Sequence, residues 1–416
     1  MSNAQPKEFD VVIAGAGMVG ASLACLLAES SLSIALVDRK RLVQGKDSDS
    51  PKLHSDKFDP RVSAISQASQ QLFRQLGVWE DMSAARVCNY SAMEVWDAEG
   101  TGSIDFSAEQ INQPELGSIV ENSIIIAALH KRVAQLENVF SITPFSIESF
   151  EQVEREDGLI VKLNADDGQA IRAPLIIAAD GANSKLRALA NFGCREWDYE
   201  QHALVTTVRT QLPHNNTALQ RFMETGPLAF LPLRSATEDD AQHFCSIVWS
   251  MLPDQAERVM SLSEDEFNSE LAAALESKLG AIEWSDKRFV FPLRQRHALD
   301  YVKEGIVLVG DAAHTIHPLA GQGVNLGLLD AKALAEELQR GIQAGRSVAD
   351  PKVLLRYQRR RKGNNLSMMW LMEGFKRLFG QQDLSIRWLR NIGMNAVDKM
   401  TPIKNQLIRK AMGLDS

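Results

Sequence analysis

The sequence has few cysteines and no long apolar run, and each shortage excludes a class of protein. Its 416 residues include four cysteines, Cys25, Cys88, Cys194 and Cys245, none of which forms a C-x-x-C pair. A disulfide framework and a thiolate zinc site are therefore not expected, and a reducing compartment is predicted. The longest apolar runs, such as Ala173–Ala179, fall well short of the roughly 20 residues that cross a bilayer.

Charge and the N-terminal sequence narrow the classes further. The first ten residues are polar and lack the pattern of a signal peptide, so export is not expected and a cytoplasmic location is predicted. The net charge of −8 argues against a nucleic-acid binder, which would more often be basic. Residues 352–410, however, carry 14 Lys and Arg against three acidic residues. This basic segment on an acidic body favours contact with an anionic surface or partner.

A glycine-rich turn lies between a buried strand and a helix at the start of the chain. Gly15, Gly17 and Gly20 fill the three places of G-x-G-x-x-G, where a pyrophosphate can approach the backbone at a helix N-terminus. Asp38 ends the second predicted strand, and a carboxylate there can accept ribose hydroxyl groups. The pattern predicts a site for FAD or NAD rather than NADP. The alternative is a chance helix cap.

Two later strands also end in an acid beside a glycine. Leu175–Ala179 precedes Asp180 and Gly181, although Asp-Gly is also a common plain turn. Ile306–Val309 precedes Gly310 and Asp311, and an acid at a strand end can hold a ribityl hydroxyl. A long helix then begins near Gly323, and its N–H groups can face the edge of a flavin. A nicotinamide enzyme has no need of this second arrangement.

The three segments, in this order, resemble the single-component FAD-dependent aromatic hydroxylases typified by p-hydroxybenzoate hydroxylase. The resemblance covers about residues 9–345 and is closer still to the ubiquinone-biosynthesis hydroxylase family. The motifs that carry it are Arg61–Ile65, Val120–Asn122 and Gly310–Asn325. Similarity to the 2-octaprenylphenol hydroxylase branch of that family lies in Met93–Asp97, Trp197–Tyr199 and Gln406–Leu414.

The fold expected from the resemblance is α/β (α+β), with a Rossmann-like FAD-binding domain. That domain would be discontinuous and comprise residues 1–75, 115–190 and 285–345. An inserted antiparallel β-sheet domain for the substrate would comprise residues 76–114 and 191–284. Residues 346–416 would form a basic helical C-terminal segment.

The resemblance also implies a reaction and a set of FAD-binding residues. The expected reaction is hydroxylation of the ring of a polyprenylated phenol by O₂, through a flavin C4a-hydroperoxide, with NAD(P)H as reductant. Hydroxylation at another ring position and a non-catalytic flavin-binding subunit remain alternatives. The residues implied to bind FAD are Gly15, Gly17, Gly20, Asp38, Arg61, Asn122, Asp180, Gly181, Gly310, Asp311, Gly321, Gln322, Gly323 and Asn325.

Candidates for catalysis and substrate contact are fewer. His314, His317 and Pro318 flank the segment expected beside the isoalloxazine ring. The histidines could handle protons or be packed, hydrogen-bonded loop residues. They lack the further ligands that a metal site needs, so no metal is expected. The three residues Phe230, Leu231 and Pro232 could form an apolar wall over the flavin or ordinary sheet core.

Three alternatives are open for the basic C-terminal segment. It could contact the inner membrane peripherally, bind proteins of a ubiquinone-biosynthesis complex, or form a lid on the FAD-binding domain. Basic residues mixed with Trp and Phe suit a membrane interface. A homo-oligomer is also expected.

Overall fold

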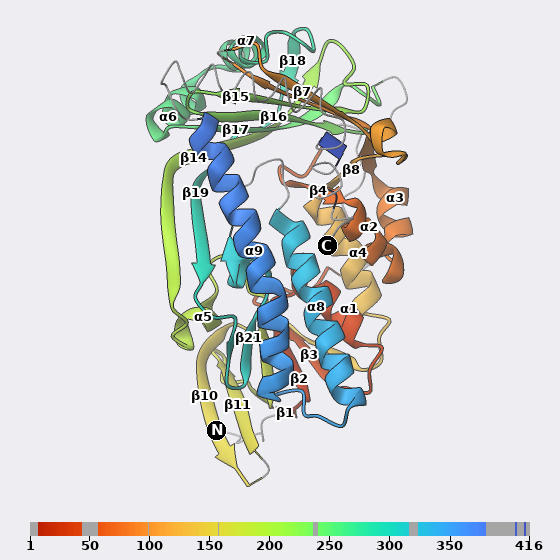
Figure 1. The fold of residues 1–416 in the computed structure, drawn as a ribbon, viewed down its shortest axis with the longest axis vertical. Helices are drawn as coiled ribbons and strands as arrows, with labels where there is room; N and C mark the ends of the chain where they lie inside the picture. The colour runs from red at the N-terminus through yellow and green to blue at the C-terminus, as the bar shows by residue number, and fades with distance from the viewer. Residues whose placement is uncertain are drawn as a thin grey trace.

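The computed structural model describes residues 7–43, 57–98, 100–156, 158–235, 240–315, 323–379, 404–405 and 412. Four β-sheets and a set of helices make up the described chain (Figure 1). The mixed α/β class predicted from the sequence is confirmed. No helix in these ranges is long and apolar enough to cross a membrane.

A six-stranded sheet forms the centre of the FAD-binding part. Four of its strands are short and buried along their whole length, as expected of parallel strands that are covered on both faces. Its order is β20 (Val302–Lys303), β21 (Ile306–Leu308), β13 (Leu175–Ala178), β2 (Val11–Ala14), β3 (Ile34–Val37) and β9 (Val139–Ile142). The bonds from β21 through to β9 are all parallel.

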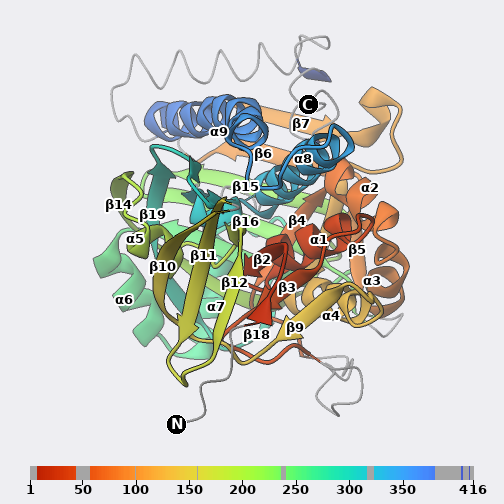
Figure 2. The same ribbon diagram turned by 90° about the horizontal axis from the view of Figure 1, so that it is seen from below.

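Helices and a smaller sheet cover the central sheet and share one apolar core with it. The helices are α1 (Met18–Leu27), α4 (Asn122–Val133), α5 (Lys185–Leu189) and α8 (Gly323–Gln343). The smaller sheet has the order β1 (Lys7–Glu8), β12 (Ala170–Ala173), β11 (Gly158–Ala165) and β10 (Ile147–Arg155). Figure 2 shows this sheet beside β2 and β3.

A large, mostly antiparallel sheet forms the other main part, in which only the β15–β6 pair among the described strands is parallel. Most of its strands lie at the top of Figure 1, and β14 and β19 run down the left side. Its path is β22 (His314–Thr315), β19 (Phe289–Ala298), β14 (Cys194–Thr210), β17 (Phe244–Met251), β16 (Gly226–Leu233), β15 (Thr217–Met223), β6 (Ala92–Asp97) and β7 (Ser103–Ser107), with β18 (Ile282–Ser285) paired to β14. A second core packs helices α6 (Pro253–Ser261) and α7 (Glu264–Ala274) onto one face.

A three-stranded sheet joins the two parts. Its order is β4 (Val62–Ser66), β8 (Gly117–Glu121) and β5 (Val87–Tyr90), and α2 (Gln67–Gln75) and α3 (Trp79–Ala85) lie beside it. An apolar cluster fills the space between this sheet and strands β16 and β17 of the large sheet, with Phe58, Ala64 and Ile119 on one side and Leu231 and Phe244 on the other. The interface between the parts is therefore tightly packed.

The sheet pairing differs from the domain boundaries expected from the sequence. Strand β5 and helix α3 belong with the FAD-binding part, since β5 pairs with β8 and Trp79 lies in its core. Strand β19 keeps residues up to Ala298 in the large sheet. We therefore propose that the inserted domain begins near Ser91, not residue 76, and that its last strand ends at Ala298, not residue 284.

Helix α9 (Pro351–Phe379) follows α8 and packs against it. With 29 residues at about 1.5 Å each it is roughly 43 Å long. In Figure 1 it runs upward from the level of β2 to that of β17 in the large sheet. The first part of the basic segment is therefore a helix, as expected.

Candidate flavin-binding site

Four motifs meet at one edge of the central sheet. Strands β2, β3, β13 and β21 are parallel neighbours, so their carboxyl ends lie together. The residues that follow these ends are Gly15, Asp38, Asp180 and Gly310–Asp311. Ligands of open α/β sheets bind at this edge. Gly15 and Asp311, nearly 300 positions apart in the sequence, thus border one site.

Glycine occupies the three positions of the first turn for different structural reasons. Gly15 has a φ of +108°, and a Cβ there would lie 2.2 Å from the carbonyl oxygen of Ala179. A Cβ on Gly20 would lie 1.9 Å from the carbonyl oxygen of Gly15. A Cβ on Gly17 would meet nothing within 4 Å. Gly15 and Gly20 therefore permit the fold of the turn, whereas Gly17 leaves open space at the start of α1.

Asp38 and His130 fix the shape of that turn. One carboxylate oxygen of Asp38 accepts the N–H of Ala16 at 2.8 Å, and the other accepts the N–H of Lys40 at 2.8 Å. His130 Nδ1 accepts the N–H of Val43, so Nε2 donates to the carbonyl oxygen of Ala16 at 2.7 Å. Burial lowers the pKa of His130, which favours this neutral form. Each Asp38 oxygen keeps a second lone pair for a ribose hydroxyl.

The second motif begins helix α5. One oxygen of Asp180 accepts the N–H groups of Lys185 and Leu186 at 2.8 and 3.2 Å, which supports the plain-turn reading. Its other oxygen is buried and accepts no hydrogen bond from the described residues. Gly181 follows with a φ of +83°, and its Cβ position is open. Asp180 therefore caps the turn and still offers one acceptor.

Asp311 has the character of a ligand-facing residue. Its side chain is exposed, yet the protein around it raises its pKa through desolvation, with an opposing effect from the charge of His314. No described residue donates a hydrogen bond to its carboxylate. A carboxylate surrounded by protein but open on one side can accept a hydroxyl group from a bound molecule.

The remaining polar residues implied to bind FAD anchor the backbone around the site. Asn325 is buried near the start of α8 at Gly323; it accepts the N–H of Ser66 at 3.0 Å and donates to the carbonyl oxygen of Ala64 at 2.7 Å. Arg61 is exposed, and its carbonyl oxygen accepts the N–H of Asn122 at 3.0 Å. Arg61 and Asn122 are therefore neighbours, and Asn325 ties α8 to strand β4.

His314 lies inside the protein. It is 1% exposed, and its Nε2 is 2.5 Å from a carboxylate oxygen of Asp330 on α8. This placement favours a packed, hydrogen-bonded histidine over proton exchange with a substrate. His317, Pro318, Gly321 and Gln322 lie outside the described residues.

The expected apolar wall divides between two faces of strand β16. Phe230 packs with Trp249 and Phe267 in the core beneath α6 and α7. Leu231, on the opposite face, packs with Phe58 and Ile119 of the FAD-binding part. Alternation along a strand puts Pro232 on the face of Phe230. Leu231 is thus the one member of this trio on the side toward the flavin motifs, and it lies in a packed cluster.

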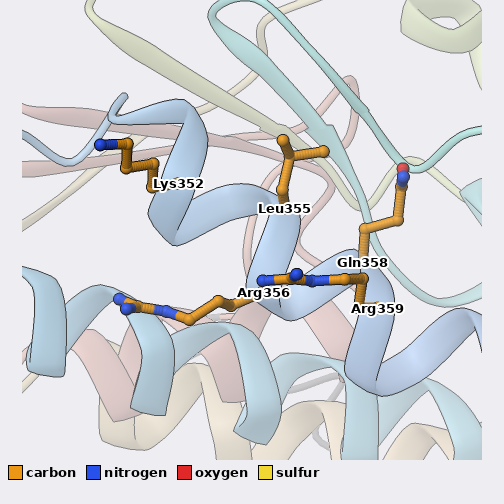
Figure 3. A pocket seen from close by; sticks show the side chains of 5 residues that line it. All are labelled: Lys352, Leu355, Arg356, Gln358 and Arg359. Atoms are coloured by element: carbon orange, nitrogen blue, oxygen red, sulfur yellow. The ribbon is translucent and has the colours of Figure 1, made fainter.

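An open pocket of about 570 Å³ lies away from these motifs, on helix α9 (Figure 3). Lys352, Leu355, Arg356, Gln358 and Arg359 line it. Arg356 pairs with Glu337 at 3.0 Å, whereas Lys352 and Arg359 are exposed. The pocket is basic, and it belongs to the C-terminal segment. No group of three metal-binding side chains occurs among the residues that the structure describes.

Sequence reasoning missed two buried polar residues that hold these motifs in place, Asp330 and Arg361, and it gave no role to a third, Arg187, which follows the Asp180-Gly181 turn. An acid among the apolar residues of α8 is a signal that could have identified Asp330. Arg361 stands in a run of four basic residues, and no feature of that run sets it apart.

The described residues fit FAD. Gly17 leaves space beside the uncapped N-terminus of α1, where free N–H groups can bind phosphate. Asp38 stands beside the turn with lone pairs to spare, and Asp311 stands open at the end of β21. One site therefore offers groups for the pyrophosphate, the adenosine ribose and the ribityl chain.

Comparisons with known proteins agree with this geometry. Residues 8–368 match the FAD binding domain family. The 3-demethoxyubiquinol 3-hydroxylase of Escherichia coli (strain K12) is 36% identical over 410 residues, 99% of each chain. The mitochondrial ubiquinone biosynthesis monooxygenase COQ6 of Xenopus tropicalis is 32% identical and covers 98% of this chain and 94% of its own. The solved p-nitrophenol 4-monooxygenase of Pseudomonas putida has the same fold, with a TM-score of 0.76, 18% identity and 98% of each chain covered.

The family match and the relatives, at 32% and 36% identity over nearly the whole chain, show that the protein is an FAD-dependent monooxygenase, as the sequence predicted. Within that class, the chain belongs to the family of the ubiquinone-biosynthesis hydroxylases. The resemblance to this family is confirmed by similarity along nearly the whole chain, whereas the narrower similarity to its 2-octaprenylphenol hydroxylase branch stays a prediction.

Proposed function

We propose that the protein hydroxylates the aromatic ring of a polyprenylated phenol in ubiquinone biosynthesis, with a 2-polyprenylphenol as first candidate substrate. The observation that carries the proposal is the set of FAD-binding groups at one sheet edge, in a chain related throughout to ubiquinone hydroxylases. Bound FAD, reduced by NAD(P)H, would supply the chemistry that activates O₂.

The residues of this chain would bind and enclose the cofactor. Asp38 would accept the ribose hydroxyl groups, the start of α1 would hold the pyrophosphate, and Asp311 would hold the ribityl chain. The packed cluster around Leu231 would exclude water from the side of the large sheet. We assign no catalytic base, since His314 is held by Asp330 inside the protein.

A second substrate deserves equal testing because of one relative. The Escherichia coli protein at 36% identity is named a 3-demethoxyubiquinol 3-hydroxylase. The second candidate reaction is therefore hydroxylation of a demethoxyubiquinol at another position of the ring. Two substrates with similar rings differ only slightly in how they fit an apolar pocket, so the structure does not choose between them. The two candidates therefore have to be separated by their products.

The test uses purified protein loaded with FAD, NADPH, O₂, and either a short-tailed 2-prenylphenol or a short-tailed demethoxyubiquinol. The expected result is NADPH oxidation that the phenol accelerates, with one oxygen atom added to the ring by mass spectrometry. Hydroxylation of the demethoxyubiquinol alone would establish the second candidate. Bound FAD without any substrate-stimulated NADPH oxidation would instead establish a non-catalytic subunit.

We also propose that α9 makes peripheral contact with an anionic membrane, where a polyprenyl substrate resides. Lys352, Leu355, Arg359 and Trp370 recur at helical spacing on one face; Leu355 is 43% and Trp370 69% exposed. Arg359→Glu should reduce binding to vesicles with anionic lipid, whereas Arg41→Glu, at an exposed arginine outside α9, should not. Equal binding of both variants would favour contact with proteins of a biosynthetic complex.

We also propose that the protein forms a homo-oligomer. Light scattering of the purified protein would check this by its mass in solution.

A further inference from the structure

One buried carboxylate joins the Gly310–His314 segment to the C-terminal helix. Asp330, on α8, is 0% exposed. One of its oxygens accepts the N–H of Gly310 at 3.2 Å and lies 2.5 Å from Nε2 of His314. The other oxygen accepts Nε–H of Arg361 at 2.7 Å and the side-chain amide of Asn365 at 3.1 Å. The two oxygens thus face two different segments.

The charges at this carboxylate favour a fixed arrangement. Burial alone would raise the pKa of Asp330, but the charges and hydrogen bonds of His314 and Arg361 outweigh it and lower the pKa to about 2. The Arg361 side chain is only 5% exposed. Removal of one partner from such a pair leaves a buried charge without compensation.

The network continues into the large sheet. The amide of Asn365 also donates to the hydroxyl of Tyr301 at 3.3 Å, and that hydroxyl is 3.1 Å from Nε2 of His297 on β19. On the same side, the hydroxyl of Tyr357 donates to the carbonyl oxygen of Leu308, the last residue of β21. Helix α9 therefore contacts the end of β21 directly and is linked through Tyr301 to β19, the strand that pairs with β22 at His314.

We propose that Asp330 is a positioning residue of the flavin site, and that through Arg361 it makes helix α9 part of that site. The inference rests on the proposed assignment of Gly310–Asp311 to the flavin. Asp311 follows directly on Gly310, whose N–H is held by Asp330 and whose φ is +57°. A change at Arg361, which contacts the other oxygen of the carboxylate, would then alter the position of the Asp311 side chain relative to the flavin.

The test measures FAD affinity in Arg361→Gln, a residue that contacts neither Gly310 nor His314. Full-length apoprotein is titrated with FAD, and quenching of flavin fluorescence gives the dissociation constant. We expect binding about tenfold weaker than in the wild type, the effect of one hydrogen bond to a charged group. Asp330→Asn should weaken binding at least as much. The visible circular dichroism of the bound flavin, at saturating FAD, should change in both.

Arg356→Gln provides a matched control. Arg356 pairs with Glu337 at 3.0 Å between the same two helices, five positions before Arg361. It should lower the melting temperature of the apoprotein less than Arg361→Gln does, because the Arg356 side chain is 35% exposed and Glu337 keeps Arg340 at 3.0 Å, and it should leave FAD affinity and flavin dichroism unchanged. A merely structural role of Arg361 would lower the melting temperature of Arg361→Gln without changing its FAD affinity or flavin dichroism.

Two results would overturn the inference. One is wild-type FAD affinity and dichroism in Arg361→Gln. The other is an equal loss of affinity in Arg356→Gln. Because Arg361→Gln is tested alone as well, the outcome does not depend on whether Asp330→Asn folds. Failure of the wild-type chain to bind FAD would refute the proposed function instead, so the two failures are distinct.

Discussion

Arg187 donates a hydrogen bond from Nη1 to the carbonyl oxygen of Ala312 at 2.9 Å, across 125 positions of sequence. Its Nη2 donates to the carbonyl oxygen of Ala182 at 2.8 Å. One guanidinium thus joins the turn after β13 to the turn after β21. Burial and the nearby charge of Arg296 lower the pKa of Arg187, yet the group stays charged at any pH at which the protein is studied.

Arg187→Met should therefore remove the link between the turn after Asp180 and the turn after Asp311. Ala312 would lose this donor, while Ala182 keeps a hydrogen bond from Arg296. A hydrogen bond to a charged group is worth about 2 kcal/mol of unfolding free energy. Urea unfolding of the apoprotein should show this loss. Arg294→Met, at an arginine whose side chain is 61% exposed, is the control and should change stability by less than about 0.5 kcal/mol.

Two glycines of the first turn should separate folding from cofactor binding. Gly17→Ala places its methyl group in open space, so the apoprotein should lose less than about 1 kcal/mol of stability while FAD binding falls sharply. Gly20→Ala places its methyl group 1.9 Å from the carbonyl oxygen of Gly15, so both stability and binding should fall. Thermal melts and FAD titrations of the two apoproteins check this. Equal behaviour of the pair would contradict the roles given to these glycines.

Asp311→Ala should abolish FAD binding without destabilising the apoprotein. No described residue donates a hydrogen bond to this carboxylate, and desolvation raises its pKa, so its charge opposes folding at neutral pH. The purified variant should lack the visible flavin absorbance yet melt at or above the wild-type apoprotein temperature. Asp300→Ala, on the neighbouring loop, should keep its flavin. Full flavin occupancy in Asp311→Ala would remove the ribityl assignment.

Stability should fall in mild acid because of buried histidines. Burial lowers the pKa of His214 from 6.5 to about 4, although its hydrogen bond to the carbonyl oxygen of Leu233 acts the other way. The unfolded chain then binds a proton that the folded protein does not. The stabilisation is complete above pH 6.5 and is lost as the pH falls toward 4.

Urea unfolding between pH 8 and pH 4.5 (both chosen to bracket that range) measures this effect. His214→Leu should be less stable at pH 8, because Leu233 and Asn216 lose their partner. Its stability should also depend less steeply on pH. Part of the slope should remain, since the pKa of His297 is likewise lowered by burial to about 4. A variant with an unchanged slope would show that His214 is not the titrating group.

Much of the cofactor site was predictable because local patterns define it. Glycine at 15, 17 and 20 and acids at the ends of apolar strands are read from a few adjacent residues, and the structure puts them at one sheet edge. The face that Phe230 occupies was not predictable, because it depends on strand register, and a shift of one residue exchanges the two faces. The same holds for the ends of the inserted domain, which depend on the pairing of β5 and β19.

The sequence by itself determined the class of protein, its cofactor and the order of the motifs that bind it. Those properties follow from residue types at short spacings, which act through the local backbone. Only the tertiary structure decided that His314 is buried against Asp330 and that Arg361, in an otherwise ordinary basic run, completes the group. A buried charge needs a partner, and the chain provides the partners of Asp330 from strand β22 and helix α9, which meet helix α8 only in the folded protein.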